Sequence, residues 1–370
     1  MIDNKKVAIT HDHLFQIGGA ENVLLEFHKM FPESPIYTLI CNRRSREFLK
    51  GCNIVTSSIQ KIPGATKLFK WFLVFMPKAW ESFDLSKYDI ILSSTSAFAK
   101  GINKTKNAVH FCYCHTPTRY LWSDMKEYVD GLGVPKFTKF FLINILEKMK
   151  HWDFQKAQEV DYFIANSKFI ADRIKKYYKR DSEIIYPPVD TFKCYSDKKE
   201  DYYILVSRLR PYKKVDLAIK AFNQLKLPLK IIGGGDGYVD YLKSISKNNI
   251  EFLGEVSDDV KYEYLSKAKA FIHPQEEDFG ISAVEAMASG CPVIAYGSGG
   301  ALETVIDSQT GVFFEEQKWE SLAEAILDFS KKSFDSGFIK NYAEKFNSQR
   351  FEKEIKNYIE EKYSNHLQER

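Results

Sequence analysis

The stretch FIHPQEEDFGISAVEAMASGCPVIAY, residues 271–296, decides the fold and carries most of the candidate chemistry. It reads as an apolar strand end, a loop that carries Glu277, a helix of small residues that carries Glu285, and a second apolar strand over 291–296. A helix rises 1.5 Å per residue, so eight steps place the two carboxylates at most roughly 12 Å apart.

The start of the predicted helix is suited to an anion. The amides of Gly280, Ile281 and Ser282 open the helix, where unpaired N–H groups and the helix dipole favour a diphosphate. The two acids are spaced like the hexose and the ribose of a nucleotide sugar, so this unit fits sugar, diphosphate and ribose in order. The alternative is that each Glu is an ordinary cap or a solvated partner of the dipole.

Composition bounds the class of protein. A chain of 370 residues is too long for one compact core and suits two domains of about 180 residues. The net charge of +4 and the absence of a basic, base-stacking helix argue against nucleic-acid binding. Six cysteines without zinc-ligand spacing, no signal-peptide pattern and no apolar run of 18 residues predict a reducing cytosol and no membrane span.

Short β-type runs alternate with helical periodicity through both halves of the chain. This alternation predicts an α/β protein with two Rossmann-like, doubly wound parallel sheets that face a cleft. The turn YPPVD at 186–190 reads as a stiff linker, because two prolines fix φ and remove donors. The expected domains are 1–185 for the acceptor and 186–345 for the nucleotide sugar. A C-terminal helix, 346–370, is expected to cross back to the first domain.

Several candidate ligand-binding residues follow predicted strands, where such sheets bind ligands. Gly18 and Gly19 precede a helix and allow close approach of a phosphate. Arg208 and Lys213 suit the growing charge of a departing diphosphate. His115 ends a strand and suits a hexose hydroxyl. Taken singly, these residues also fit a plain turn, solvated cations and a structural histidine.

Two further strand-end loops complete the candidate site. Gly234 lies in IIGGGDG (231–237), where glycines permit a tight backbone close to a nucleotide or simply form a turn. Val256 ends FLGEV (252–256), whose backbone is placed to contact a base. No Asp-x-Asp motif, which many metal-dependent transferases use to hold a nucleotide diphosphate, occurs in the chain. Charge stabilisation without a metal is therefore expected.

Together these features resemble the retaining glycosyltransferases of family 4, which have the GT-B fold. The resemblance spans essentially the whole chain and is strongest in EEDFGISAVEAMASGCPVIA, with support from SRLRPYKKVDLAIKAF and the GGAE loop. HDHL (11–14), HTPTRYLW (115–122) and YGSGGALETV (296–305) are more narrowly similar to bacterial mannosyltransferases of polysaccharide assembly that use GDP-mannose. Departures are SRL where many members have GRL, and YKK where many have EKG.

The resemblance implies specific roles. Glu285 would bind the ribose, and Arg208 and Lys213 would hold the diphosphate with help from Gly19. Glu277, with the amides of Phe279 to Ile281, would grip the donor sugar, and His115 would contact it from the first domain. Family members retain the anomeric configuration, and the departing phosphate is thought to accept the acceptor's proton. A nucleotide-sugar donor and a glycan or polyprenyl-diphosphate-linked acceptor in O-antigen or capsule synthesis are implied, with no metal.

Two segments mix lysine with aromatic and aliphatic residues, namely 61–80 and 134–152. Such composition is typical of helices that lie in a bilayer interface, although the same segments could cover the core or a partner. If they bind lipid, the protein is peripheral on the inner face of the cytoplasmic membrane.

Other functions remain open from the residues alone. A glycoside hydrolase would use Glu277 and Glu285 as its carboxylate pair, but has no use for a cationic diphosphate site. A transferase specific for UDP- or dTDP-sugars, a sugar-nucleotide epimerase and a nucleotide-sugar-binding protein would share the same scaffold. Turnover without an acceptor would identify the epimerase, and binding without transfer would identify the binding protein.

Overall fold

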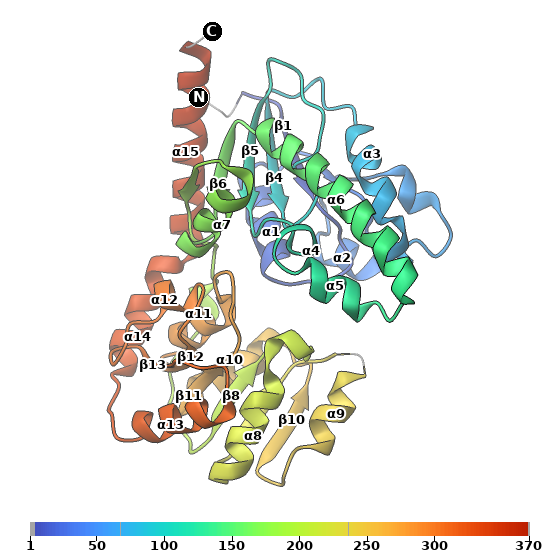
Figure 1. Ribbon diagram of the computed structural model, residues 1–370. Helices are drawn as coiled ribbons and strands as arrows, with labels where there is room; N and C mark the ends of the chain where they lie inside the picture. Colours follow the sequence, from blue (N-terminus) through green and yellow to red (C-terminus); the bar gives the residue numbers. More distant parts are fainter. Residues whose placement is uncertain (1–3, 67, 236, 369–370) are drawn as a thin grey trace. The chain divides into compact units, whose positions relative to one another are not determined.

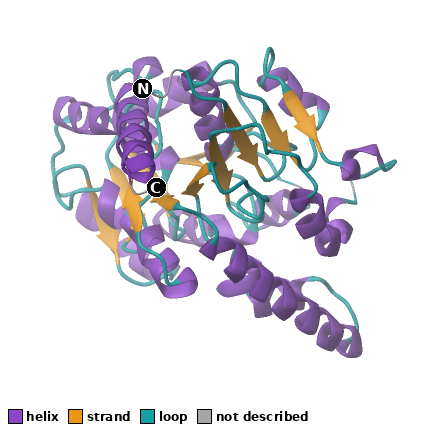
Figure 2. Cartoon of the chain, turned by 90° about the horizontal axis from the view of Figure 1, so that it is seen from above, coloured by secondary structure: helices purple, strands orange, loops and turns teal. Residues whose placement is uncertain are grey.

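A computed structural model describes residues 4–66, 68–235 and 237–368. The chain folds into two compact units (Figure 1). Unit 1 comprises Met1–Tyr186 and Phe351–Arg370, and unit 2 comprises Pro187–Arg350. Each unit is built around one parallel sheet, and Figure 2 shows strands lying between helices.

The sheet of unit 1 has, among the described residues, seven parallel strands in the order β3-β2-β1-β4-β5-β6-β7. Its central strands are entirely buried, which explains their nearly continuous apolar sequences. The strands are β1 (Val7–His11), β2 (Ile36–Thr38), β3 (Ile54–Thr56), β4 (Ile90–Thr95), β5 (Val109–Cys114), β6 (Tyr162–Ala165) and β7 (Ser182–Ile184).

Helices cover both faces of this sheet. They are α1 (Gly19–Met30), α2 (Arg43–Phe48), α3 (Met76–Glu81), α4 (Arg119–Trp122), α5 (Met125–Gly131), α6 (Lys136–Gln158), α7 (Lys168–Tyr178) and α15 (Ser348–Gln368), with 3-10 turns η1 (Ser58–Lys61) and η2 (Phe69–Phe75). The last helix belongs to unit 1 through a stripe of buried side chains spaced four residues apart, Phe351, Ile355, Ile359 and Tyr363. This spacing keeps all four on the helix face that packs against the core.

Unit 2 repeats the architecture with six described parallel strands in the order β10-β9-β8-β11-β12-β13. The strands are β8 (Tyr203–Val206), β9 (Leu229–Ile232), β10 (Ile250–Gly254), β11 (Ala270–His273), β12 (Val293–Tyr296) and β13 (Gly311–Phe314). The helices are α8 (Val215–Leu225), α9 (Tyr238–Ser244), α10 (Asp258–Lys267), α11 (Ile281–Ala288), α12 (Ala301–Thr304), α13 (Trp319–Phe329) and α14 (Ser336–Ala343), with 3-10 turns η3 (Thr191–Lys193), η4 (Pro211–Lys213) and η5 (Glu344–Phe346).

The predicted α/β class with two doubly wound parallel sheets is confirmed. Three short strands, β3, β7 and β13, were not predicted. The first two are three-residue edge strands whose residues are partly or fully exposed, so they lack the long apolar run that marks a buried strand.

Candidate active site

The cationic part of the candidate site lies directly after β8. Arg208 is exposed on the loop, and Pro211 opens η4, which ends at Lys213. Proline suits the first position of such a turn because its φ is already close to the helical value. Lys214 then adopts a left-handed conformation (φ 53°) as the N-cap of α8, so Lys213 lies at the junction between a turn and a helix.

Glu277, in the loop that follows β11, accepts from two donors. The Lys213 ammonium forms an ion pair with its carboxylate, and Gln275 Nε2 donates to Oε1 at 3.0 Å. Burial alone would raise the pKa of Glu277, but the charges of Lys213 and His273 outweigh it and lower that pKa to about 2. The carboxylate is therefore ionised at neutral pH and acts as a hydrogen-bond acceptor.

This ionisation bears on the hydrolase alternative. A glycoside hydrolase needs one carboxylic acid that stays protonated, with a raised pKa, to donate to the leaving oxygen. The pKa of Glu277 is shifted in the opposite direction. The arrangement favours gripping a hydroxyl-rich ligand beside a cation over protonating a glycosidic oxygen.

The loop that carries Glu277 is held from behind by Gly299 and Gly300. The amide of Gly300 donates to the Glu277 carbonyl at 2.8 Å, and residues 277 and 299 form an isolated parallel bridge. A Cβ at Gly299 would lie 2.3 Å from the Glu277 carbonyl oxygen, and one at Gly300 would lie 2.3 Å from Phe279 Cα. In the sequence, YGSGG (296–300) contributed only to the family resemblance, and this packing of its glycines was not predicted.

Glu285 lies on α11, after Gly280 opens the helix with φ 92°. Its Oε1 lies 3.0 Å from Lys261 Nζ and accepts from the Tyr262 hydroxyl at 3.5 Å, both on α10. Ile281 is the first residue of α11, so the helix begins where the sequence predicted an anion-binding end. The lysine partner of Glu285 was not predicted.

The glycine-rich loop after β9 packs against the loop that holds Arg208. A Cβ at Gly233 would lie 1.8 Å from the Ser207 carbonyl oxygen, and Leu209 donates its amide to the Gly234 carbonyl at 2.8 Å. Close backbone packing therefore accounts for at least one of these glycines. Val256 is half-buried, two residues after β10.

The remaining predicted residues lie on unit 1. Gly18 is the N-cap of α1, and Gly19 is its first residue. His115 directly follows β5, and its ring accepts or donates one hydrogen bond, between Nε2 and Ser94 Oγ at 2.8 Å. Burial lowers the pKa of His115 to about 4, so the imidazole is neutral at pH 7.

Asp12, which sequence analysis did not single out, organises the loop that follows β4. It is buried and accepts hydrogen bonds from four consecutive backbone amides, those of residues 96–99, at 2.7 to 2.9 Å. The Thr95 hydroxyl donates to the same carboxylate. One side chain thus satisfies the backbone of the loop that leaves the carboxyl end of β4.

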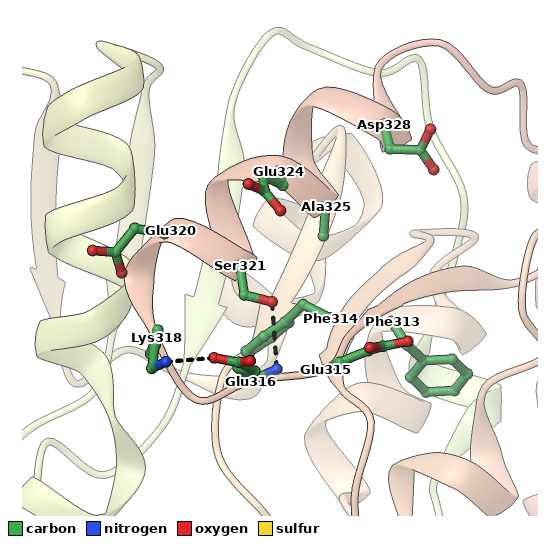
Figure 3. A pocket seen from close by; sticks show the side chains of 10 residues that line it. All are labelled: Phe313, Phe314, Glu315, Glu316, Lys318, Glu320, Ser321, Glu324, Ala325 and Asp328. Atoms are coloured by element: carbon green, nitrogen blue, oxygen red, sulfur yellow. Dashed lines mark hydrogen bonds and ion pairs between the residues drawn. The ribbon is translucent and has the colours of Figure 1, made fainter.

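A groove of about 650 Å³ lies elsewhere on unit 2 (Figure 3). Glu320, Glu324 and Asp328 of α13 line it together with the loop residues Glu315 and Glu316, and Lys318 is paired with Glu316. It contains none of the predicted residues, and its acidic lining is unsuited to a diphosphate. Within the described ranges, no cluster of three or more His, Cys, Asp or Glu side chains could hold a metal ion.

Two family models match the chain almost end to end. Residues 17–193 match Glycosyltransferase Family 4, and residues 190–353 match Glycosyl transferases group 1. Both halves of the chain are therefore matched by glycosyltransferase domains. Enzymes of this type use nucleotide-sugar donors.

The glycosyltransferase is similar to several characterised and uncharacterised proteins. It is 33% identical over 172 residues to an uncharacterized glycosyltransferase from Methanocaldococcus jannaschii, a match that covers 45% of this chain and 49% of that relative. It is 26% identical over 415 residues to the alpha-1,3/1,6-mannosyltransferase ALG2 of Kluyveromyces lactis, covering 90% of this chain and 79% of the relative.

Solved structures agree with the fold of the glycosyltransferase. The crystal structure of Anabaena HepE in complex with UDP has a TM-score of 0.71 to it at 18% identity, covering 96% of this chain and 100% of HepE. At that identity the likeness concerns the fold. Within the described part of the glycosyltransferase, no helix combines the length and apolar composition needed to cross a bilayer.

Proposed function

We propose that this glycosyltransferase transfers mannose from GDP-mannose to a glycan or a polyprenyl-diphosphate-linked oligosaccharide, with retention of anomeric configuration, in the synthesis of a surface polysaccharide such as O-antigen or capsule. The observation that carries this proposal is the ion pair of Lys213 with Glu277, placed after β8 and β11 and followed by the helix start at Gly280. The mannosyltransferases among its relatives support mannose as the sugar.

In this proposal, Lys213 and Arg208 hold the donor diphosphate and stabilise the charge that grows as the sugar departs. Glu277 is freed from part of its ion pair when the diphosphate engages Lys213, and its ionised carboxylate accepts hydrogen bonds from sugar hydroxyls. The amides of Phe279, Gly280 and Ile281 supply further donors at the positive end of α11.

The other predicted residues complete the proposal. Glu285 accepts hydrogen bonds from the ribose, and Lys261 holds its carboxylate in place. Gly234 and Val256 lie against the nucleotide base. On unit 1, Gly18 and Gly19 allow the phosphates to approach the N-terminus of α1, and His115 contacts the sugar. Metal ions take no part, and the leaving phosphate accepts the acceptor's proton.

The donor is tested directly by thermal shift with GDP-, UDP-, dTDP- and ADP-sugars. A ligand that binds only the folded state raises its melting temperature, by an amount that corresponds to roughly 2.7 kcal/mol at a hundredfold excess over Kd. GDP-mannose should give the largest shift, and Glu285→Ala should reduce that shift. Transfer to a mannose-containing acceptor, followed by NMR of the new anomeric centre, tests retention. A larger shift with UDP- or dTDP-sugars would replace the proposed donor.

We further place the enzyme on an anionic membrane surface. In the N-terminal half of α6, Phe140 is 66% exposed and Phe141 is 63% exposed, and Phe75 of η2 is 61% exposed. Neither 61–80 nor 132–146 contains an acidic residue, while both contain lysines. Exposed aromatic side chains beside lysines match the interface of an anionic bilayer.

Flotation with vesicles tests this location. The natural protein should float with phosphatidylglycerol vesicles and sediment with neutral phosphatidylcholine vesicles. A Phe140→Ala/Phe141→Ala variant should lose binding, whereas Leu327→Ala, an exposed apolar residue of unit 2, should retain it. Equal recovery of the natural protein with and without anionic vesicles would end the proposal, and concentration-dependent dimers would assign the patch to self-association.

A further inference from the structure

A row of polar side chains crosses the carboxyl ends of β1, β4 and β5 in unit 1. Ser94 Oγ lies 3.1 Å from His11 Nδ1 and 2.8 Å from His115 Nε2. His11 and Ser94 are register partners on adjacent strands, which places their side chains on the same face. At the far end, His11 Nε2 lies 3.7 Å from Glu21 Oε1 on the first turn of α1.

The inner members of this row are sealed from solvent. His11, Ser94 and Glu21 are each at most 3% exposed. Burial raises the pKa of Glu21, but the hydrogen bond and charge of His11 outweigh it, so the net shift is downward and the carboxylate is ionised at neutral pH. An ionised acid facing His11 Nε2 keeps a proton on that nitrogen.

The Ser94 hydroxyl has a single hydrogen, so it can donate to only one of the two imidazoles. Its oxygen must then accept a hydrogen bond from the other imidazole, and this fixes the positions of the protons. When His11 is neutral, its proton sits on Nε2, its Nδ1 takes the Ser94 hydrogen, and His115 must donate from Nε2. The outer Nδ1 of His115 then carries a lone pair. When His11 is doubly protonated, its Nδ1 donates to Ser94, Ser94 donates to His115 Nε2, and His115 Nδ1 carries the proton.

We propose that Glu21, His11 and Ser94 are positioning residues that set the tautomer of His115. In this proposal, Nδ1 of His115 accepts a hydrogen bond while His11 is neutral. The same nitrogen donates a hydrogen bond once His11 is protonated. The consequence for catalysis rests on the proposed contact of His115 with the donor sugar, because only the accepting form can bind a sugar hydroxyl that donates its proton.

Other titratable groups near the row are already engaged. Both oxygens of Asp12 accept from residues 95–99, and His13 stacks on Phe15 with ring centroids 4.1 Å apart. Burial lowers the pKa of His13 to about 4, so its imidazole is neutral at pH 7. Neither group is hydrogen-bonded to Ser94, so the row passes from His11 to His115 through one hydroxyl.

The same sheet contains a matched control. Ser93, the neighbour of Ser94 on β4, lies 2.5 Å from His110 Nε2 and accepts from Thr10 Oγ1 at 2.9 Å. Successive residues of a strand point to opposite faces, so this second row is separate from the first. The Thr10 hydroxyl also contacts the Ala99 carbonyl, and at the other end the Asp161 carboxylate accepts from the backbone amide of His110.

The test uses the full chain labelled with ¹⁵N-histidine, with His115 identified from the spectrum of His115→Gln. Imidazole nitrogen shifts are recorded between about pH 5 and 8 for the natural protein, Ser94→Ala, Glu21→Gln and Ser93→Ala. In the natural protein and in Ser93→Ala, the tautomer of His115 should change together with the protonation of His11. In Ser94→Ala and in Glu21→Gln, the ring of His115 should become a mixture of tautomers that no longer follows His11.

Unchanged His115 shifts in Ser94→Ala or in Glu21→Gln, whichever variant folds, would overturn the proposal. Activity adds a separate measurement. Ser94→Ala should lower kcat about tenfold, the loss expected for one hydrogen bond. A change in tautomer without a change in kcat would uphold the relay and remove the contact of His115 with the sugar from the proposed function.

Discussion

The two units hold their polar groups in opposite ways. In unit 2, the side chains of Lys213, Glu277 and Glu285 are paired as ions and are 13% to 23% exposed. In unit 1, His11, Ser94 and Asp12 are at most 4% exposed; His11 is hydrogen-bonded to Ser94, and Asp12 accepts from residues 95–99. A partly exposed ion pair can exchange one partner for a ligand charge, whereas a sealed network is fixed when the chain folds. The contrast suggests that unit 2 adapts to its ligand and unit 1 presents a rigid surface.

The largest effect should come from Asp12→Ala in the sealed network. The substitution leaves the backbone amides of residues 96–99, two of which are buried, without their acceptor, so the free energy of unfolding should fall by about 3–5 kcal/mol. Urea denaturation followed by circular dichroism measures this change. Glu276→Ala is the control, because that carboxylate accepts only a surface hydrogen bond from Ser298. If Asp12→Ala and Glu276→Ala were equally stable, the buried hydrogen bonds of Asp12 would contribute no more to stability than a surface hydrogen bond.

Next in size are Lys213→Ala and Glu277→Ala in the exchangeable pair. Each should lower the rate of sugar transfer about 10²–10³-fold, since each removes a charge that acts on the reacting group. The melting temperature should also fall, because each substitution leaves the other charge of a largely buried pair without its partner. Initial rates with a nucleotide-sugar donor, together with thermal denaturation, separate the two effects. Turnover that is unchanged in either variant would contradict the assigned roles.

The two regions should also respond to acid in different pH ranges. The pKa of His115 is lowered to about 4 by burial, so the unfolded chain takes up its proton first and stability falls as the pH drops from 6.5 to 4. For Glu277, burial raises the pKa but Lys213 outweighs it and brings the value to about 2. The stability that Glu277 contributes is therefore present above pH 4.5 and lost between 4.5 and 2.

Urea denaturation across pH tests this separation. His115→Gln should flatten the dependence of the unfolding free energy on pH above 4.5, by up to about 1.4 kcal/mol per pH unit. Glu277→Gln should alter it only at lower pH. A change of slope between pH 5 and 6 in Glu277→Gln would mean that this carboxylate is not held in its ionised form.

The smallest effect is expected in the acidic groove of unit 2. Glu324 is exposed on α13 and contacts none of the candidate residues. Glu324→Gln should leave both the donor-induced thermal shift and the transfer rate unchanged, because a single solvated charge contributes little. Weaker donor binding in this variant would mean that the acidic groove is part of the donor site. The distinction between paired and solvated acids would then not hold.

Sequence alone predicted the fold because its signals are local. Buried strands such as β4 and β5 are continuous apolar runs, and the stripe of α15 repeats every four residues. The edge strands β3 and β7 are too short to leave such a signal.

The candidate site could be proposed from the sequence where its residues follow a strand closely, as for Lys213 and Glu277. It was not predictable where partners come from distant segments. Ser94 is linked to His11 across 83 residues, and Lys261 reaches Glu285 from a different helix. Such pairings depend on strand register and helix placement, which leave no pattern in a single sequence. The roles of the candidate residues themselves remain predictions that await the experiments above.

Gly299 and Gly300, which pack against the loop that carries Glu277, restrict how this enzyme can be redesigned. Because the backbone at 299 and 300 touches the main chain of residues 277 and 279, the height of the acidic loop is set by the absence of two methyl groups. Adding either one would push the carboxylate away from its lysine without altering a single charge. Efforts to broaden the range of accepted donors should therefore vary other side chains near the loop and keep glycine at positions 299 and 300.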